Sequence, residues 1–172
     1  IYMKEHSSNI KYYTIFGERC SGTNYLENLF NLNFNIELTS KYGPKHFFGF
    51  KEEELKESDD TLFVCIVRDI KPWLNSFYHK PHHLIDINCQ SITNFLNNEI
   101  VSYQYKGLTF NGKEDQGEEI IMDRNMYTGK RYKNIFELRH TKIKYMIEDL
   151  PYKVKNYIFI KYEDLVSNFE NH

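Results

Sequence analysis

Residues 11–33 read KYYTIFGERCSGTNYLENLFNLN and predict a strand, a loop and a helix in succession. The β-branched and aromatic stretch Lys11–Phe16 is typical of a strand. Residues 23–33 carry apolar side chains at helical spacing, which predicts an amphipathic helix. The loop between them, Gly17–Gly22, has a glycine at each end. A strand that passes through such a loop into a helix indicates an α/β fold.

A second unit begins at residues 61–67, which read TLFVCIV. A continuous apolar run of this length is typical of a central parallel strand that is buried on both faces. A helix from Pro72 to about Tyr78 follows, and a third strand is expected over Asn156–Lys161. This alternation predicts a three-layer α/β fold of the P-loop type, with a central, mainly parallel sheet flanked by helices. Nothing marks a second domain, so residues 1–172 are expected to form one domain.

The other segments are assigned from their hydrophobic spacing and their glycines and prolines. We expect mostly loop over 34–50, a short charged helix over 51–57, an amphipathic segment over 91–103, a mobile loop or lid over 104–119, the longest helix over 132–150 and a short helix over 162–169. Pro151 is expected to end the longest helix.

The composition excludes several classes of protein. Lys and Arg total 22 against 24 for Asp and Glu, and the net charge of −2 argues against a broad basic surface for nucleic acid. No stretch approaches 18 apolar residues and no signal peptide is visible, so no membrane span is expected. Three cysteines, an odd number, fit a reducing compartment and a cytoplasmic location, with a Golgi-lumenal or trimmed protein as the alternative. No pattern specifies an oligomeric state.

The loop Gly17–Gly22 is the first candidate anion site. Its backbone N–H groups, with the N-terminus of the following helix, can surround a phosphate. It matches the nucleotide-binding P-loop up to Gly22, but Thr23 stands where that motif requires a lysine. An ordinary strand-to-helix turn is the alternative interpretation.

Arg68 and Ser76 form the second candidate anion site. Arg68 follows the 61–67 strand directly, and Ser76 lies eight residues later, about two helical turns along. A bidentate guanidinium and a hydroxyl can converge on one phosphate. The alternative is an arginine that caps the strand and pairs with Asp69 or with a helix end.

Three short motifs stand in order along the chain: Ser21-Gly22-Thr23, then Arg68 to Ser76 followed by Tyr78-His79, then Tyr162-Glu163-Asp164-Leu165. Together they resemble the P-loop sulfotransferase family. The resemblance covers nearly the whole chain. It implies that the donor is 3′-phosphoadenosine 5′-phosphosulfate (PAPS), that the product is 3′-phosphoadenosine 5′-phosphate (PAP), and that no metal is needed.

The resemblance also implies roles for individual residues. The 5′-phosphosulfate would be bound by the first loop and the start of its helix, that is by Arg19, Cys20, Ser21, Gly22, Thr23 and Asn24. The 3′-phosphate would be bound by Arg68 and Ser76, and Arg131 or Lys130 would close that site.

One residue departs from the family pattern. Cys20 stands where the family has a lysine or arginine directly before Ser-Gly-Thr. Either Arg19 supplies the missing charge through a shifted loop, or another cation such as Lys45 does so.

Transfer to a hydroxyl acceptor requires a base, and His46 is the first candidate. It lies in the segment Gly43-Pro-Lys-His-Phe47, 22 residues before Arg68, a spacing similar to that in many members of the family. Glu37, after the first helix, is the second candidate. The acceptor class is a carbohydrate, a peptide or a small molecule.

Two other functions fit parts of the sequence. A P-loop kinase of a nucleotide or small molecule fits the first loop, although the missing lysine counts against it. A degenerate module that binds the nucleotide without turnover would explain why Cys20 stands in place of the expected lysine or arginine. No metal site is expected, because His79, His82 and His83 lack a fourth ligand.

Overall fold

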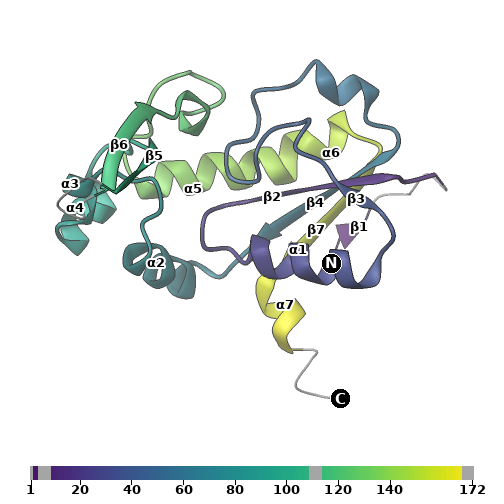
Figure 1. Ribbon diagram of the computed structural model, residues 1–172, viewed down its shortest axis with the longest axis horizontal. Helices are drawn as coiled ribbons and strands as arrows, with labels where there is room; N and C mark the ends of the chain where they lie inside the picture. Colours follow the sequence, from purple (N-terminus) through teal and green to yellow (C-terminus); the bar gives the residue numbers. More distant parts are fainter. Residues whose placement is uncertain (1, 4–8, 109–113, 168–172) are drawn as a thin grey trace.

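A five-stranded sheet lies at the centre of the computed structural model, which describes residues 2–3, 9–108 and 114–167 (Figure 1). The strand order is β1-β7-β4-β2-β3. Four strands are parallel, and β1 pairs antiparallel with β7 at one edge. The bounds are Tyr2–Met3 for β1, Tyr12–Gly17 for β2, Glu37–Leu38 for β3, Thr61–Val67 for β4 and Asn156–Lys161 for β7.

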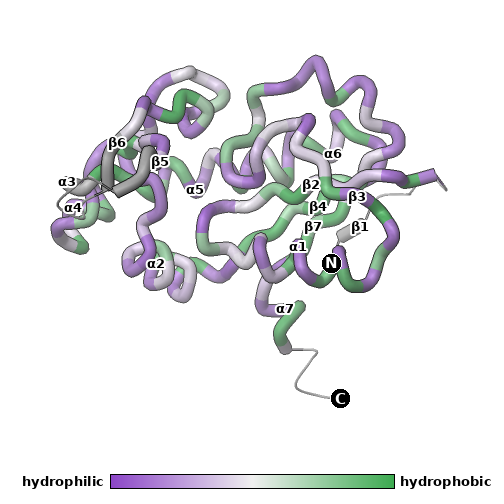
Figure 2. The backbone as a smooth tube through the Cα atoms, viewed as in Figure 1, coloured by the Kyte–Doolittle hydropathy of each residue, from purple (hydrophilic) through white to green (hydrophobic). Residues whose placement is uncertain are grey.

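Strand β4 is buried along its whole length because it is paired on both sides, with β2 and β7. Its side chains alternate between the two faces of the sheet. One set packs in a core with Phe16 and Tyr157, and the other packs with Ile15 and Ile160. Figure 2 shows the hydrophobic residues concentrated along these central strands.

Helices cover both faces of the sheet. On one face lie α1 (Thr23–Asn33) and α7 (Tyr162–Ser167), which contribute Leu26, Phe30 and Leu165 to the core. On the other lies a long helical run made of α5 (Ile135–Lys144), a π-helical stretch (Tyr145–Asp149) and α6 (Leu150–Lys153). The prediction of an α/β fold with a central parallel sheet flanked by helices is therefore confirmed.

The sequence predicted that the longest helix ends at Pro151, but the helical run continues past Pro151 to Lys153. Pro151 lies in the first turn of α6, where its missing N–H removes no hydrogen bond that the turn needs. The π-helical stretch over Tyr145–Asp149 comes directly before it and absorbs the change in hydrogen-bonding pattern.

A second group of elements lies between β4 and α5, at one end of the sheet (Figure 1). It contains α2 (Ile70–His79), α3 (Asp86–Cys89), α4 (Ile92–Asn97), β5 (Tyr103–Leu108) and β6 (Glu114–Glu119). The helices α2, α3 and α4 share a core around Trp73, Phe77, Phe95 and Tyr132.

Several sequence predictions are wrong in this region and nearby. The expected lid over 104–119 contains an antiparallel hairpin, β5 with β6, although residues 109–113 lie outside the described part of the chain. The amphipathic segment over 91–103 is helical only to Asn97. Residues 34–50 are mostly loop, as expected, with the two-residue β3 within them, whereas the expected charged helix over 51–57 is one 3₁₀ turn, Glu54–Glu57. Within the described residues, no helix is both long and apolar enough to cross a membrane.

The connections of the sheet diverge between β2 and β4. The chain leaves β2 through α1 to reach β3 on one side, whereas it leaves β4 to reach β7 on the other. Open α/β sheets bind ligands at the carboxyl ends of the strands at such a point. Gly17 is paired with Ile66, so the loop after β2 and Arg68 after β4 emerge side by side.

Candidate functional site

The loop of residues 17–22 is held in shape by its own backbone. The N–H of Gly17 donates to the carbonyl of Lys45 at 3.0 Å, and the N–H and Oγ of Ser21 both donate to the carbonyl of Glu18, at 3.1 and 2.6 Å. Cys20 and Gly22 have positive φ values of 63° and 97°. The N-cap residue of α1 is Gly22, which has no side chain to cap the helix, so among the described residues the first N–H groups of α1 are available to an anion.

Gly22 is required by the close approach of Tyr162. A Cβ at position 22 would lie 2.4 Å from Cδ2 of Tyr162, which is closer than any real contact. The Tyr162 ring also lies 4.9 Å from the Cζ of Arg68. The residue directly after β7 therefore packs against both predicted anion sites.

We expect Gly22→Ala to destabilise the protein more than Gly129→Ala. Both glycines have a positive φ, so each substitution carries the cost of a left-handed residue, about 1–2 kcal/mol. Nothing lies within 4 Å of a Cβ on Gly129, whereas one on Gly22 displaces Tyr162. Urea denaturation of the two variants measures the difference, and equal losses of unfolding free energy would contradict the packing of Tyr162 on the loop.

The structure brings the two predicted anion sites together at Cys20. The Nη1 of Arg68 donates to the carbonyl of Cys20 at 3.4 Å. Ser76, on α2, lies close enough to the Cys20 thiol to act on its pKa, and the thiol itself donates to the carbonyl of Lys80 at 3.7 Å. The Nε of Arg68 is buried and has no partner among the described residues. Within the described residues Asp69 makes no ion pair with this guanidinium; its N–H donates to Oε1 of Glu163 at 3.0 Å.

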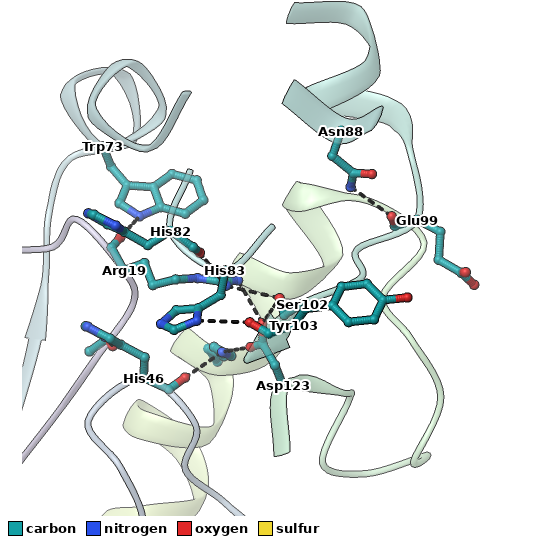
Figure 3. A network of polar contacts seen from close by, with 12 residues as sticks. Arg19, His46, Trp73, His82, His83, Asn88, Glu99, Ser102, Tyr103 and Asp123 are labelled. Atoms are coloured by element: carbon teal, nitrogen blue, oxygen red, sulfur yellow. Dashed lines mark hydrogen bonds and ion pairs between the residues drawn. The ribbon is translucent and has the colours of Figure 1, made fainter. Parts of the chain in front are cut away.

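The guanidinium of Arg19 is buried and points into the protein, toward Ser102 and Asp123 (Figure 3). It donates to Asp123 at 2.8 Å and to the Ser102 hydroxyl and the His82 carbonyl at 3.1 and 3.0 Å. It also lies over the ring of Phe77, with Cζ 4.8 Å from the ring centre. These contacts do not place its charge where a bound 5′-phosphosulfate would need it.

Lys45, the alternative cation, lies beside the first turn of α1. Its Nζ donates to Oδ1 of Asn24 at 2.5 Å and to Oε2 of Glu27 at 3.2 Å. Its side chain keeps 34 % of its surface exposed. Lys45 is therefore an accessible positive charge close to the uncapped end of the helix.

His46 is next to the same loop. Its Nδ1 lies 2.9 Å from the carbonyl of Gly17, and because a carbonyl only accepts, Nδ1 carries the proton. Nε2 therefore carries the lone pair. Burial lowers the pKa of His46 to about 3, and the charges of Arg19, Lys142 and Lys45 add to this effect. The imidazole is consequently neutral at pH 7, so Nε2 is free of a proton, but a pKa this low also makes it a weak base.

Two predicted site residues lie elsewhere. Glu37 begins β3 and pairs with Tyr12, at the opposite end of β2 from the loop, so its place in the sheet contradicts the prediction that it is a base at this site. Arg131 donates to both carboxylate oxygens of Glu119, at 2.9 and 2.8 Å, and to Glu99 at 3.2 Å. These hydrogen bonds direct its guanidinium toward Glu119 and Glu99, and among the described residues no hydrogen bond or ion pair links it to Arg68.

Four further charged side chains lie together at the inner side of the loop: Glu18, Asp123 and Lys142, which are buried, and Arg139, which is partly buried. Arg139 donates to Oε2 of Glu18 at 2.6 Å, and Lys142 donates to Asp123 at 2.5 Å and to the His46 carbonyl at 2.7 Å. Two of them had a signal in the sequence. Arg139 is one of only five arginines, and Lys142 is a charge on the inner side of the longest helix.

Burial sets the protonation of this cluster. Burial alone would raise the pKa of Asp123, but Arg19, Lys142 and Ser102 hold it below its ordinary value. Burial lowers the pKa of Lys142. It raises the pKa of Glu18 to about 7, although Arg139, Lys142 and Arg19 act in the opposite direction.

Glu18→Gln is expected to change how stability depends on pH. The ordinary pKa of a glutamate is 4.5 and that of folded Glu18 is about 7, so the folded state binds more protons between these values. The contribution of Glu18 to stability is therefore present below pH 4.5 and lost as the pH rises through 7. Urea denaturation from pH 4.5 to 8 measures this loss in the wild type and in Glu18→Gln. Parallel curves would contradict the raised pKa.

Comparisons of this chain with models of protein families, with curated proteins and with solved structures found no match. Within residues 2–3, 9–108 and 114–167, no three His, Cys, Asp or Glu side chains are grouped so that they could hold a metal ion. The function of the site is therefore argued from its own chemistry.

Proposed function

We propose that this protein is a sulfotransferase of the P-loop type, which transfers a sulfuryl group from PAPS to an acceptor hydroxyl. One observation carries the proposal. The glycine-bounded loop, Arg68 and Ser76 converge on Cys20 at the point where the connections of the sheet diverge. Two anion sites side by side suit a nucleotide that carries both a 5′-phosphosulfate and a 3′-phosphate.

Each anion has its own donors under this proposal. The 5′-phosphosulfate is bound by the 17–22 loop and by the uncapped N–H groups at Thr23 and Asn24. The 3′-phosphate is bound by Arg68 and Ser76. Arg68 has an unpaired Nε and a guanidinium supported by the Tyr162 ring, so it can turn a fork of donors toward a phosphate.

The transfer step uses two further residues. The acceptor oxygen forms a bond to sulfur while the bond from sulfur to the bridging phosphate oxygen breaks, and PAP leaves. Nε2 of His46 takes the acceptor proton. The negative charge that develops on the leaving phosphate is stabilised by Lys45 and by the N–H groups of the loop.

A second candidate function is a module that binds the nucleotide without turnover. The inward position of Arg19 favours it, because that guanidinium is engaged by Asp123 and Cys20 brings no charge in its place. The accessible Lys45 beside α1 favours the enzyme. Thr23 in place of a lysine counts against a kinase, since ATP chemistry uses that lysine on the β- and γ-phosphates.

We expect PAP to bind the wild type and Arg68→Ala to weaken that binding about 10- to 100-fold, because a charge-assisted contact to phosphate is lost. Isothermal titration calorimetry measures both affinities. Arg124→Ala is the matched control, because Arg124 pairs with Glu119 at the hairpin and is expected to leave the affinity unchanged. No PAP binding to the wild type, or equal binding to the wild type and Arg68→Ala, would refute the proposal.

His46→Ala is expected to lower kcat about 10²- to 10⁴-fold, the usual contribution of a general base, and to leave PAP affinity nearly unchanged. Transfer from radiolabelled PAPS to a panel of sugars, phenols and peptides measures kcat. Full activity of the variant would rule out His46 as the base. If the wild type binds PAP and transfers to no acceptor in the panel, the binding module becomes the better description.

A further inference from the structure

The guanidinium of Arg139, on α5, contacts a residue of each of the two candidate anion sites. Its Nη1 donates to Oε2 of Glu18 at 2.6 Å, and its Nη2 donates to the carbonyl of Arg68 at 2.7 Å. Cζ lies 4.5 Å from the ring centre of Trp73, so the plane of the guanidinium rests on an aromatic surface. One rigid group thus contacts the loop after β2, the end of β4 and helix α2.

The contact to Glu18 reaches the anion-binding loop through the backbone. The Glu18 carboxylate is fully buried. Within the described residues its Oε2 accepts from Arg139 and its Oε1 has no partner. The carbonyl of the same residue accepts both hydrogen bonds of Ser21. The residue whose carbonyl shapes the loop is therefore the one whose side chain Arg139 anchors.

Trp73 supports the same arrangement. Its Nε1 donates to the carbonyl of Arg19 at 2.8 Å, and its side chain is completely buried. The loop is consequently tied to α2, which carries Ser76, and through Arg139 to Arg68. A lysine at position 139 could keep the charge but could not donate in two fixed directions from one plane.

We propose that Arg139 and Glu18 form a positioning pair that sets the separation between the 5′-phosphate site and the 3′-phosphate site. This inference rests on the proposed function. Neither side chain touches the ligand; the pair acts through the backbone of Glu18 and Arg68. Its effect is specific to a nucleotide with two phosphates, because a ligand that occupies only one site does not sense their separation.

The test compares PAP with adenosine 5′-phosphate, which lacks the 3′-phosphate. Calorimetry at pH 8 measures both affinities for the wild type, for Arg139→Lys and for the matched control Arg124→Lys, whose arginine pairs with Glu119 outside the site. We expect Arg139→Lys to weaken PAP about tenfold or more, since small displacements of binding groups have effects of this size. Affinity for adenosine 5′-phosphate should hardly change, and the control should behave as the wild type.

Parallel losses for both nucleotides in Arg139→Lys would show a general structural role and would overturn the inference, as would unchanged affinity for PAP. Glu18→Ala is the second variant, since it removes the oxygen that accepts from Arg139, and thermal unfolding verifies that each variant is folded. It should show the same selective loss of PAP, and a parallel loss would again overturn the inference. If the wild type itself does not bind PAP, the proposed function fails first and the inference fails with it.

Discussion

The site depends on one buried carboxylate, Asp123, and the two cations that compensate it. Its oxygens accept from Arg19 at 2.8 Å and from Lys142 at 2.5 Å, and all three side chains are at most 2 % exposed. They come from the loop after β2, the segment after β6 and helix α5. Removing one partner of such a group leaves an uncompensated buried charge, which costs about 3–5 kcal/mol. These three segments are therefore held together as one unit.

This constraint explains how the site departs from its sequence motif. Arg19 is the cation that the loop carries, yet its charge is used inside the protein, where it balances Asp123. The positive charge at the start of α1 comes instead from Lys45, which is far along the chain. Lys142 donates to the His46 carbonyl as well, so the same buried charges hold the segment that carries the candidate base.

Part of the site could be predicted because it depends on local geometry. A strand that enters a glycine-bounded loop and then a helix brings its N–H groups to one place, and the residue after an adjacent parallel strand emerges beside it. Glu37 was misplaced because its strand is only two residues long and lies at the other end of β2. Arg131 was misplaced because its partner Glu119 ends β6, a strand with no apolar alternation, and its other partner, Glu99, lies in the segment before β5.

The sequence by itself determined the parallel sheet, since residues 62–67 are apolar at every position and a strand covered on both faces buries them all. It also determined that the 17–22 loop and Arg68 lie next to each other, because they follow adjacent parallel strands. Only the tertiary structure decided where the charges go. Whether an arginine faces a ligand or a buried carboxylate depends on which segments fold against it, and Asp123 and Arg139 lie more than 100 residues from the loop in the chain.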